Sequence, residues 1–295
     1  LEDFKPDAIL VHGDTTSTLA ASLAGYYQQI PLLHIEAGLR TDNIYSPWPE
    51  EINRRVVSTI AQYHFAPTAQ AKSNLLKEGI PEERIGVTGN TVIDALFMIL
   101  NRISENPSIK SNLKKKFKFL DTGKKLLLVT GHRRENFGEG FQNICFALKE
   151  LALQRADIEI LYPVHLNPNV LSPVKEILGA TSNIHLIEPQ DYLSFAYLMD
   201  RSEIILTDSG GIQEEAPSLG KPVLVLRDTT ERPEALTAGT VLLVGTNRVE
   251  IIKHVNNLLD DPRLYESMSQ ATNPYGDGYA SKKILNTILQ SIWKK

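Results

Sequence analysis

The residues from Thr207 to Ala216 read Thr-Asp-Ser-Gly-Gly-Ile-Gln-Glu-Glu-Ala and directly follow a short apolar run at 204–206. Backbone amides of a glycine-rich turn that opens a helix, together with the positive end of the helix dipole, bind phosphate groups. A carboxylate one helical turn deeper suits the two hydroxyls of a ribose. These residues and the basic and acidic loop at 227–234 predict a site for an anionic, hydroxyl-rich ligand such as a nucleoside diphosphate sugar. The candidate binding residues are Ser209, Gly210, Gly211, Glu215 and Arg232.

Two carboxylates follow the first two apolar runs of the sequence, and a third opens a helix. Asp14 and Glu36 come after these runs, and Glu50 comes after a proline-rich loop. Carboxylates beside a substrate transfer protons, so all three are candidates for acid and base roles. Structural roles remain open: Asp14 could belong to a helix N-cap, and Glu50 and Glu51 could simply favour the helix dipole. We interpret His34, which lies inside an apolar run, as a core histidine.

Two further loops carry histidines. Four ionisable residues stand in a row at 132–135, after an apolar run and before a predicted amphipathic helix at 141–153. Their charge and the helix N-terminus predict an anion-binding turn, with an ordinary surface loop as the alternative. His165 follows the next run, where a Pro-Asn turn with an incidental histidine is an equal possibility. The residues singled out in these loops are His132, Arg133, Glu135 and His165.

The elements that must position these residues are strands of parallel sheets. Ten short apolar runs alternate with amphipathic stretches, a pattern typical of α/β folds. Four runs precede residue 90 and six follow residue 124, so we predict two α/β units that divide near residues 90–95, the first with fewer strands. The expected strands are 8–11, 32–35, 64–65, 85–87, 126–129, 158–161, 184–187, 204–206, 223–226 and 241–244.

Helices are predicted between these strands and at the end of the chain. The lysine run at 114–116 is interpreted as a solvated helix face. The helix that starts at Glu50 is expected to have as its apolar positions Ile52, Val56, Val57 and Ile60. The segment 279–295 is expected to be a helix that carries on one side Ile284, Leu285, Ile288, Leu289 and Ile292.

Composition and missing motifs exclude several classes of protein. The 295 residues contain 31 Lys+Arg and 35 Asp+Glu, a net charge of −4, so no bulk positive field would hold nucleic acid or an acidic membrane. A single cysteine, Cys145, rules out an intramolecular disulfide and fits a reducing compartment, so we expect a cytoplasmic protein. No apolar run approaches the ~20 residues of a membrane span. The signatures of standard dinucleotide, P-loop, zinc-protease and serine-hydrolase sites are also absent.

Seven ordered motifs, within a match that extends over residues 6–278, resemble those of the bacterial non-hydrolysing UDP-N-acetylglucosamine 2-epimerases. These motifs are His-Gly-Asp-Thr at 12–15, His-Ile-Glu-Ala-Gly-Leu-Arg at 34–40, Ser-Pro-Trp-Pro-Glu-Glu at 46–51, Gly-Asn-Thr-Val-Ile-Asp at 89–94, Thr-Gly-His-Arg-Arg-Glu-Asn at 130–136, Asp-Ser-Gly-Gly-Ile-Gln-Glu-Glu at 208–215 and Arg-Asp-Thr-Thr-Glu-Arg-Pro-Glu at 227–234. The resemblance implies two Rossmann-like domains of GT-B type with an interdomain active-site cleft. The expected domains are residues 1–92 with the helix at 279–295, and residues 93–278.

The resemblance also implies a reaction and its residues. Family members interconvert UDP-GlcNAc and UDP-ManNAc by eliminating UDP and adding it back, supply ManNAc units for surface polysaccharide synthesis, form homodimers, and use no nicotinamide or metal. By resemblance, Asp14, Glu36 and Glu50 form the acid/base set, His132 lies near the sugar–diphosphate junction, Ser209, Gly210 and Gly211 hold phosphate, and Glu215 holds ribose. Arg133, Glu135 and His165 resemble positions that bind a second, activating UDP-GlcNAc.

Three alternative functions remain open. A hydrolysing epimerase would release ManNAc and UDP, a GT-B glycosyltransferase would need an acceptor groove, and a sugar-nucleotide binding module would show no turnover. The family's N-terminal strand with its Gly-Thr-Arg-Pro-Glu motif has no counterpart in the sequence. We therefore expect these 295 residues alone to be poorly soluble or inactive, and a chain extended upstream by roughly 80 residues to epimerise.

Overall fold

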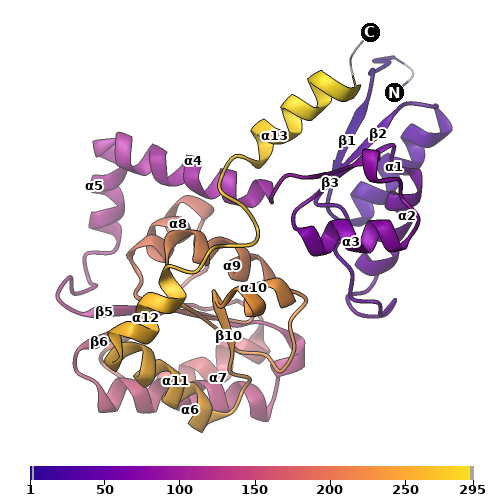
Figure 1. The fold of residues 1–295 in the computed structure, drawn as a ribbon. Helices are drawn as coiled ribbons and strands as arrows, with labels where there is room; N and C mark the ends of the chain where they lie inside the picture. Colours follow the sequence, from indigo (N-terminus) through magenta and orange to yellow (C-terminus); the bar gives the residue numbers. More distant parts are fainter. Residues whose placement is uncertain (2, 293–295) are drawn as a thin grey trace. The chain divides into compact units, whose positions relative to one another are not determined.

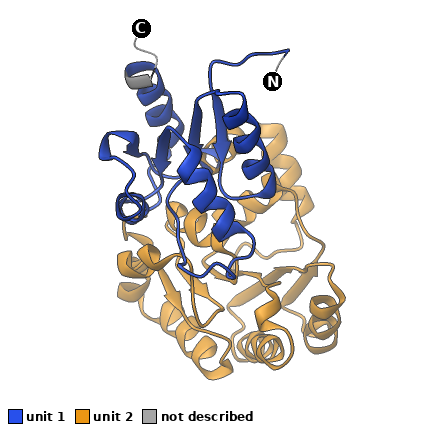
Figure 2. Cartoon of the chain, turned by 90° about the vertical axis from the view of Figure 1, so that its right-hand side faces the viewer, with its two compact units in different colours: residues 1–95, 274–295 blue, residues 96–273 orange. Residues whose placement is uncertain are grey.

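The computed structural model describes residues 1 and 3–292, which form two compact units (Figure 2). Residues 1–95 and 274–295 make up the first unit, and residues 96–273 make up the second. Residues 293–295, which end the predicted C-terminal helix, lie outside the described part of the chain. Among the described residues, no helix combines the length and the apolar character that crossing a membrane requires.

The first unit holds a parallel sheet in the order β1-β2-β3-β4, four strands within the described residues (Figure 1). Its strands are β1 (Ile9–His12), β2 (Leu32–Ile35), β3 (Tyr63–Ala66) and β4 (Ile85–Val87). Its helices are α1 (Thr16–Tyr27), α2 (Glu50–Ile60), α3 (Ala69–Lys77), the 3-10 turn η1 (Glu82–Arg84) and α13 (Ala280–Thr287), which continues as a π turn at Ile288–Ile292. Helix α4 (Thr91–Glu105) begins in this unit and ends in the second.

The second unit holds a parallel sheet in the order β10-β9-β8-β5-β6-β7, six strands within the described residues. Its strands are β5 (Lys125–Thr130), β6 (Ile158–Pro163), β7 (Ile184–Ile187), β8 (Ile204–Thr207), β9 (Val223–Val225) and β10 (Val241–Leu243). Its helices and 3-10 turns are α5 (Pro107–Lys116), η2 (Arg134–Asn136), α6 (Glu139–Gln154), α7 (Pro168–Leu178), α8 (Tyr192–Arg201), α9 (Gly210–Glu215), η3 (Ala216–Leu219), α10 (Pro233–Ala238), α11 (Arg248–Asp260) and α12 (Pro262–Ser269).

All ten predicted strands are confirmed to within two residues at each end, as is the division of four and six among the described residues. The inner strands β5, β6, β8 and β9 are buried over most of their length, because helices pack on both faces of a parallel sheet, whereas the edge strands β7 and β10 are mostly only partly buried. The helix predicted at 141–153 is α6, and the lysine run forms the exposed last turn of α5.

Two predicted apolar faces are wrong in part. Helix α2 buries Val57, but Ile52 is 40% exposed, and its buried face carries Glu51, Arg54 and Ser58. This face is polar because it pairs with groups on neighbouring loops, as described below. In the C-terminal helix, Ile284 and Ile288 pack against the first sheet, whereas Leu285 and Leu289 are exposed because they lie one residue further round the helix.

Strand order decides which loops meet. In the second sheet β5 lies between β8 and β6, and Thr130 pairs in register with Thr207. All these strands are parallel, so the loops that follow β5, β6 and β8 leave the same edge. In the first sheet His12 pairs with Ile35, which places the loops after β1 and β2 side by side.

Two histidines lie inside the first unit, and they predict acid sensitivity. His34 and His64 pair in register on β2 and β3 and are fully buried. His34 is the core histidine that the sequence predicted, and one ring nitrogen lies 2.8 Å from the carbonyl oxygen of Gly13. Burial and nearby Arg54 lower the pKa of His34 to about 3, and burial and Arg40 lower the pKa of His64 to about 4.

Because these folded-state pKa values lie below the unfolded value of about 6.5, the unfolded chain binds more protons as pH falls below 6.5. The stability that neutral His64 confers is therefore complete above pH 6.5 and is lost as pH falls toward about 4. We expect the free energy of unfolding, measured by urea titration, to fall over this range, and His64→Phe to flatten the fall. An unchanged pH slope in His64→Phe would contradict this assignment.

Candidate functional site

Two of the predicted carboxylates, Asp14 and Glu36, meet at Arg54 of helix α2. Arg54 is 5% exposed and donates hydrogen bonds to the Asp14 carboxylate and to the backbone carbonyl of Glu36. Its Nη2 also lies 3.5 Å from Oε2 of Glu36. A buried guanidinium that pairs with two carboxylates keeps both charged groups together and fixes their positions. The structure therefore brings together two of the three carboxylates predicted for acid and base roles.

The backbone around these carboxylates has an unusual conformation. Glu36 has a φ of 61°, in the left-handed region that non-glycine residues rarely adopt and that is enriched at functional sites. Asn90 donates to Oε1 of Glu36 at 3.3 Å. A Cβ atom at Gly13 would lie 2.9 Å from Oε2 of Glu36, so glycine is needed there for the carboxylate to approach the loop. The Glu36 side chain thus sits in a position that three other residues define.

Glu50 does not join this cluster. It is the first residue of α2, and none of the hydrogen bonds or ion pairs found among the described residues engages its carboxylate. Its neighbour Glu51 is 3% exposed and accepts from the amide of Thr41 at 3.1 Å and from Nε of Arg55 at 3.0 Å. Glu51 therefore has a structural role, while the carboxylate of Glu50 is available for a ligand.

In the second unit, the loops after β5 and β8 are joined by Asp208. This fully buried carboxylate accepts hydrogen bonds from the backbone amides of His132 and Arg133, both at 2.8 Å. The half-exposed imidazole of His132 stacks on that of His165, with ring centroids 5.5 Å apart and planes 15° apart. A residue predicted for catalysis and one predicted for regulation are therefore in contact.

The glycine turn after β8 has the features of an anion site. Ser209 is the N-cap of α9, but its hydroxyl makes no capping bond to the helix, so it is available to a ligand. A Cβ at Gly211 would meet open space, and a Cβ at Gly210 would lie 3.6 Å from the guanidinium carbon of Arg232. Arg232 is also paired with Glu214. The first amides of the helix therefore lie beside a positive charge, as phosphate recognition requires.

Glu215 lies deeper in the same turn. Glu215 is 7% exposed, and its Oε1 accepts a hydrogen bond from the hydroxyl of Tyr192 at 2.5 Å. Burial raises the pKa of the Glu215 carboxyl above its ordinary value. A buried carboxylate held by one neutral donor can accept further hydrogen bonds from hydroxyl groups, which is what a ribose offers.

The remaining predicted residues differ in the ion pairs and hydrogen bonds that they form. Glu135 forms an ion pair with Arg227 at 2.5 Å, and Arg227 also pairs with Glu231 at 2.7 Å. Nε of Arg133 is buried and makes no hydrogen bond within the described part of the chain. His165 is exposed, and its Nδ1 accepts from the amide of Asn167 at 3.1 Å.

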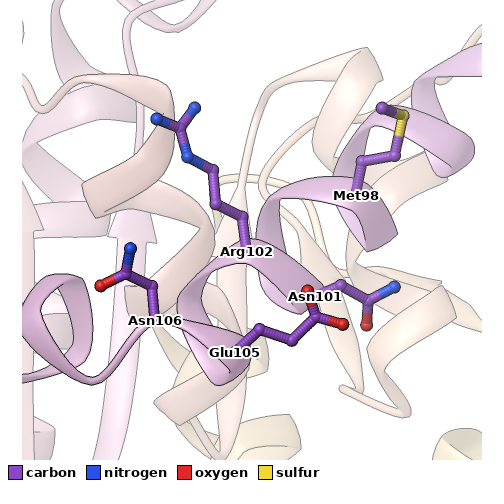
Figure 3. A pocket seen from close by; sticks show the side chains of 5 residues that line it. All are labelled: Met98, Asn101, Arg102, Glu105 and Asn106. Atoms are coloured by element: carbon purple, nitrogen blue, oxygen red, sulfur yellow. The ribbon is translucent and has the colours of Figure 1, made fainter.

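A hollow of about 540 Å³ lies at the end of α4 (Figure 3). Its lining residues are Met98, Asn101, Arg102, Glu105 and Asn106. Their side chains project from the last turns of α4 and the residue after it (Figure 3). The hollow contains none of the residues that the sequence singled out.

Sequence reasoning missed several residues of these clusters. Arg54 contacts loops that precede it by 18 and 40 residues, and the apolar pattern assigned to its helix gave no sign of this contact. Two more long-range contacts were missed: Asn90 contacts Glu36 in the first unit, and Tyr192 contacts Glu215 in the second. Asp208 belongs to the motif at 208–215, but no role was predicted for it. An acidic residue at a strand end, next to a Ser-Gly-Gly turn, was a signal that could have indicated one.

Comparisons with known proteins agree on one family. A family model described as UDP-N-acetylglucosamine 2-epimerase matches residues 1–289. A Yersinia pestis protein of that name is 62% identical over 288 residues, which cover 98% of this chain and 77% of that protein. The crystal structure of UDP-GlcNAc 2-epimerase from Neisseria meningitidis bound to UDP-GlcNAc is 57% identical, with a TM-score of 0.92, over 99% of this chain and 78% of that one. An S. aureus MnaA structure with UDP is 48% identical, with a TM-score of 0.90, over 99% of this chain and 77% of that one.

Proposed function

Because this chain belongs to the UDP-N-acetylglucosamine 2-epimerase family, we propose that it interconverts UDP-GlcNAc and UDP-ManNAc without net hydrolysis. The observation that carries the proposal is the carboxylate pair Asp14 and Glu36 at buried Arg54. Inversion of the carbon that bears the acetamido group requires a base to remove its proton and an acid to return one on the other face. A pair of carboxylates held in fixed positions provides such groups. The ligand-bound relative from Neisseria meningitidis supports a UDP-sugar as the substrate.

The proposed reaction is an elimination followed by an addition. A carboxylate takes the proton from C2, the C1–O bond breaks, and its electron pair leaves with UDP to give a glycal. UDP then adds back to C1 while C2 receives a proton on the opposite face. We assign proton transfer to Asp14, Glu36 and Glu50, and we place His132 at the sugar–diphosphate junction, where it stabilises the departing charge.

The UDP group is assigned to the glycine turn of the second unit. Ser209, Gly210, Gly211 and Arg232 would bind the diphosphate, and Glu215 would bind the ribose. The free hydroxyl of Ser209, the open space at Gly211 and the adjacent guanidinium support this assignment. Retaining UDP is essential to the proposed mechanism. If UDP left the site, water could add to C1 of the glycal in its place, and the products would be free ManNAc and UDP instead of a UDP-sugar.

Regulation, assembly and cellular setting complete the proposal. Arg133, Glu135 and His165 are assigned to an activating UDP-GlcNAc, and the stacking of His165 on His132 supports a link to the reaction. We further propose a homodimer in the cytoplasm whose product supplies ManNAc units for surface polysaccharide synthesis.

Incubation of the full-length protein with UDP-GlcNAc in D2O tests this function. We expect ¹H NMR to show deuterium at C2 of both UDP-GlcNAc and UDP-ManNAc. Each passage through the glycal exchanges the C2 proton with solvent. An Asp14→Asn variant serves as the matched control and should incorporate little. Free ManNAc with UDP as the main products would support the hydrolysing rival, and an absence of exchange would contradict an epimerase of either kind.

A further inference from the structure

One oxygen of the Asp208 carboxylate faces only hydrogen-bond donors, all on the loop after β5. Oδ2 accepts from the amides of His132 and Arg133 at 2.8 Å each and lies 3.4 Å from Nδ2 of Asn136. All three partners are donors. Oδ2 must therefore be an acceptor, whichever atom occupies the other position of the side chain.

The other oxygen of Asp208 faces the His132 ring. Oδ1 lies 3.5 Å from Nδ1 of His132, is buried, and makes no hydrogen bond to any described residue. A buried carboxylate oxygen without a donor is costly, and an Nδ1–H would supply that donor. The distance is longer than a formed hydrogen bond, as is common for catalytic contacts before substrate binds. The stacked ring of His165 restrains the plane in which His132 can turn.

We propose that Asp208 is a positioning residue that holds the His132 ring with its proton on Nδ1, so that Nε2 is the atom offered to the substrate. This inference rests on the proposed function only in assigning His132 to the reaction. The contact between Asp208 and His132 stands on geometry within one unit.

Asp208→Asn should reverse the tautomer rather than merely weaken the contact. The amide oxygen of the substituted side chain must stay at the Oδ2 position, because three donors face it. The NH2 group then occupies the Oδ1 position and faces Nδ1 as a donor. The neutral ring can form a hydrogen bond with this NH2 group only if Nδ1 is the acceptor. Its proton is then on Nε2.

The test is a long-range ¹H–¹⁵N NMR spectrum of ¹⁵N-histidine protein, with the His132 signals identified by their loss in His132→Gln. We expect the neutral ring to be Nδ1–H in the wild type and Nε2–H in Asp208→Asn. Turnover of the variant should fall at least tenfold, with UDP affinity by calorimetry within about twofold. Asp200→Asn, at an exposed position of α8, should leave tautomer and turnover unchanged.

An Nε2–H ring in the wild type, or the same tautomer in both proteins, would overturn the proposal. Should Asp208→Asn fail to fold, the wild-type spectrum alone decides, because only an Nδ1–H ring agrees with the inferred contact. A tautomer that switches in a protein without epimerase activity would instead reject the proposed function and leave the positioning role of Asp208 intact.

Discussion

Turnover of UDP-GlcNAc by the full-length protein is expected to fall by ~10²-fold or more in Asp14→Asn, because the substitution removes an ionisable group and keeps its shape. The same order of loss is expected for Glu36→Gln and Glu50→Gln. UDP affinity, measured by calorimetry, should stay within about twofold in all three variants, since the proposed UDP-binding residues belong to the second unit. Exposed Glu83 provides the matched control, and Glu83→Gln should have normal turnover.

The three substitutions differ in what else they disturb. In Glu36 one carboxylate oxygen faces Asn90 and the other faces Arg54, so the NH2 group that Glu36→Gln introduces must meet a donor. Some loss of stability should therefore accompany this substitution. Asp14→Asn can keep an oxygen toward Arg54, and Glu50 has no partner among the described residues, so these two variants report more directly on chemistry. Near-normal turnover in Asp14→Asn would reject its acid or base role.

The sequence could predict the central strands because burial on both faces leaves a continuous apolar run, which short β-branched segments such as 204–206 show plainly. It could also predict that polar residues collect at the strand ends, since parallel strands share one carboxyl edge. Asp14 and Glu36 lie together for this reason, as do the loops that carry His132 and His165.

Side-chain pairing across loops could not be predicted in the same way. Arg54 reads as one surface charge of an amphipathic helix, and only the packing of α2 beside the loops after β1 and β2 makes it a buried partner of two carboxylates. The C-terminal helix shows the same limit, because periodicity placed Leu285 and Leu289 with Ile284 and Ile288, although only the latter two reach the sheet. Periodicity gives the direction of a face but not its width.

Gly210→Val is expected to weaken UDP binding by ~10²-fold, equivalent to about 2.8 kcal/mol. The fold should tolerate the first added carbon, because a Cβ at Gly210 would lie 3.6 Å from Arg232, an ordinary contact distance. The two further methyl groups of valine would occupy the space between the first amides of α9 and the guanidinium. This is the space that we assign to the diphosphate, so the ligand, and not the fold, should bear the cost.

Calorimetry with UDP alone separates this effect from catalysis, because UDP lacks the sugar on which the carboxylates would act. Gly123→Val is the matched control. Gly123 lies in an exposed turn before β5, and its φ is outside the left-handed region. An added Cβ there would lie 3.4 Å from the nearest atom. Equal melting temperatures for the two variants would show that Gly210→Val is folded. If UDP then binds Gly210→Val as tightly as it binds Gly123→Val, the diphosphate lies elsewhere and the glycine turn is not its site.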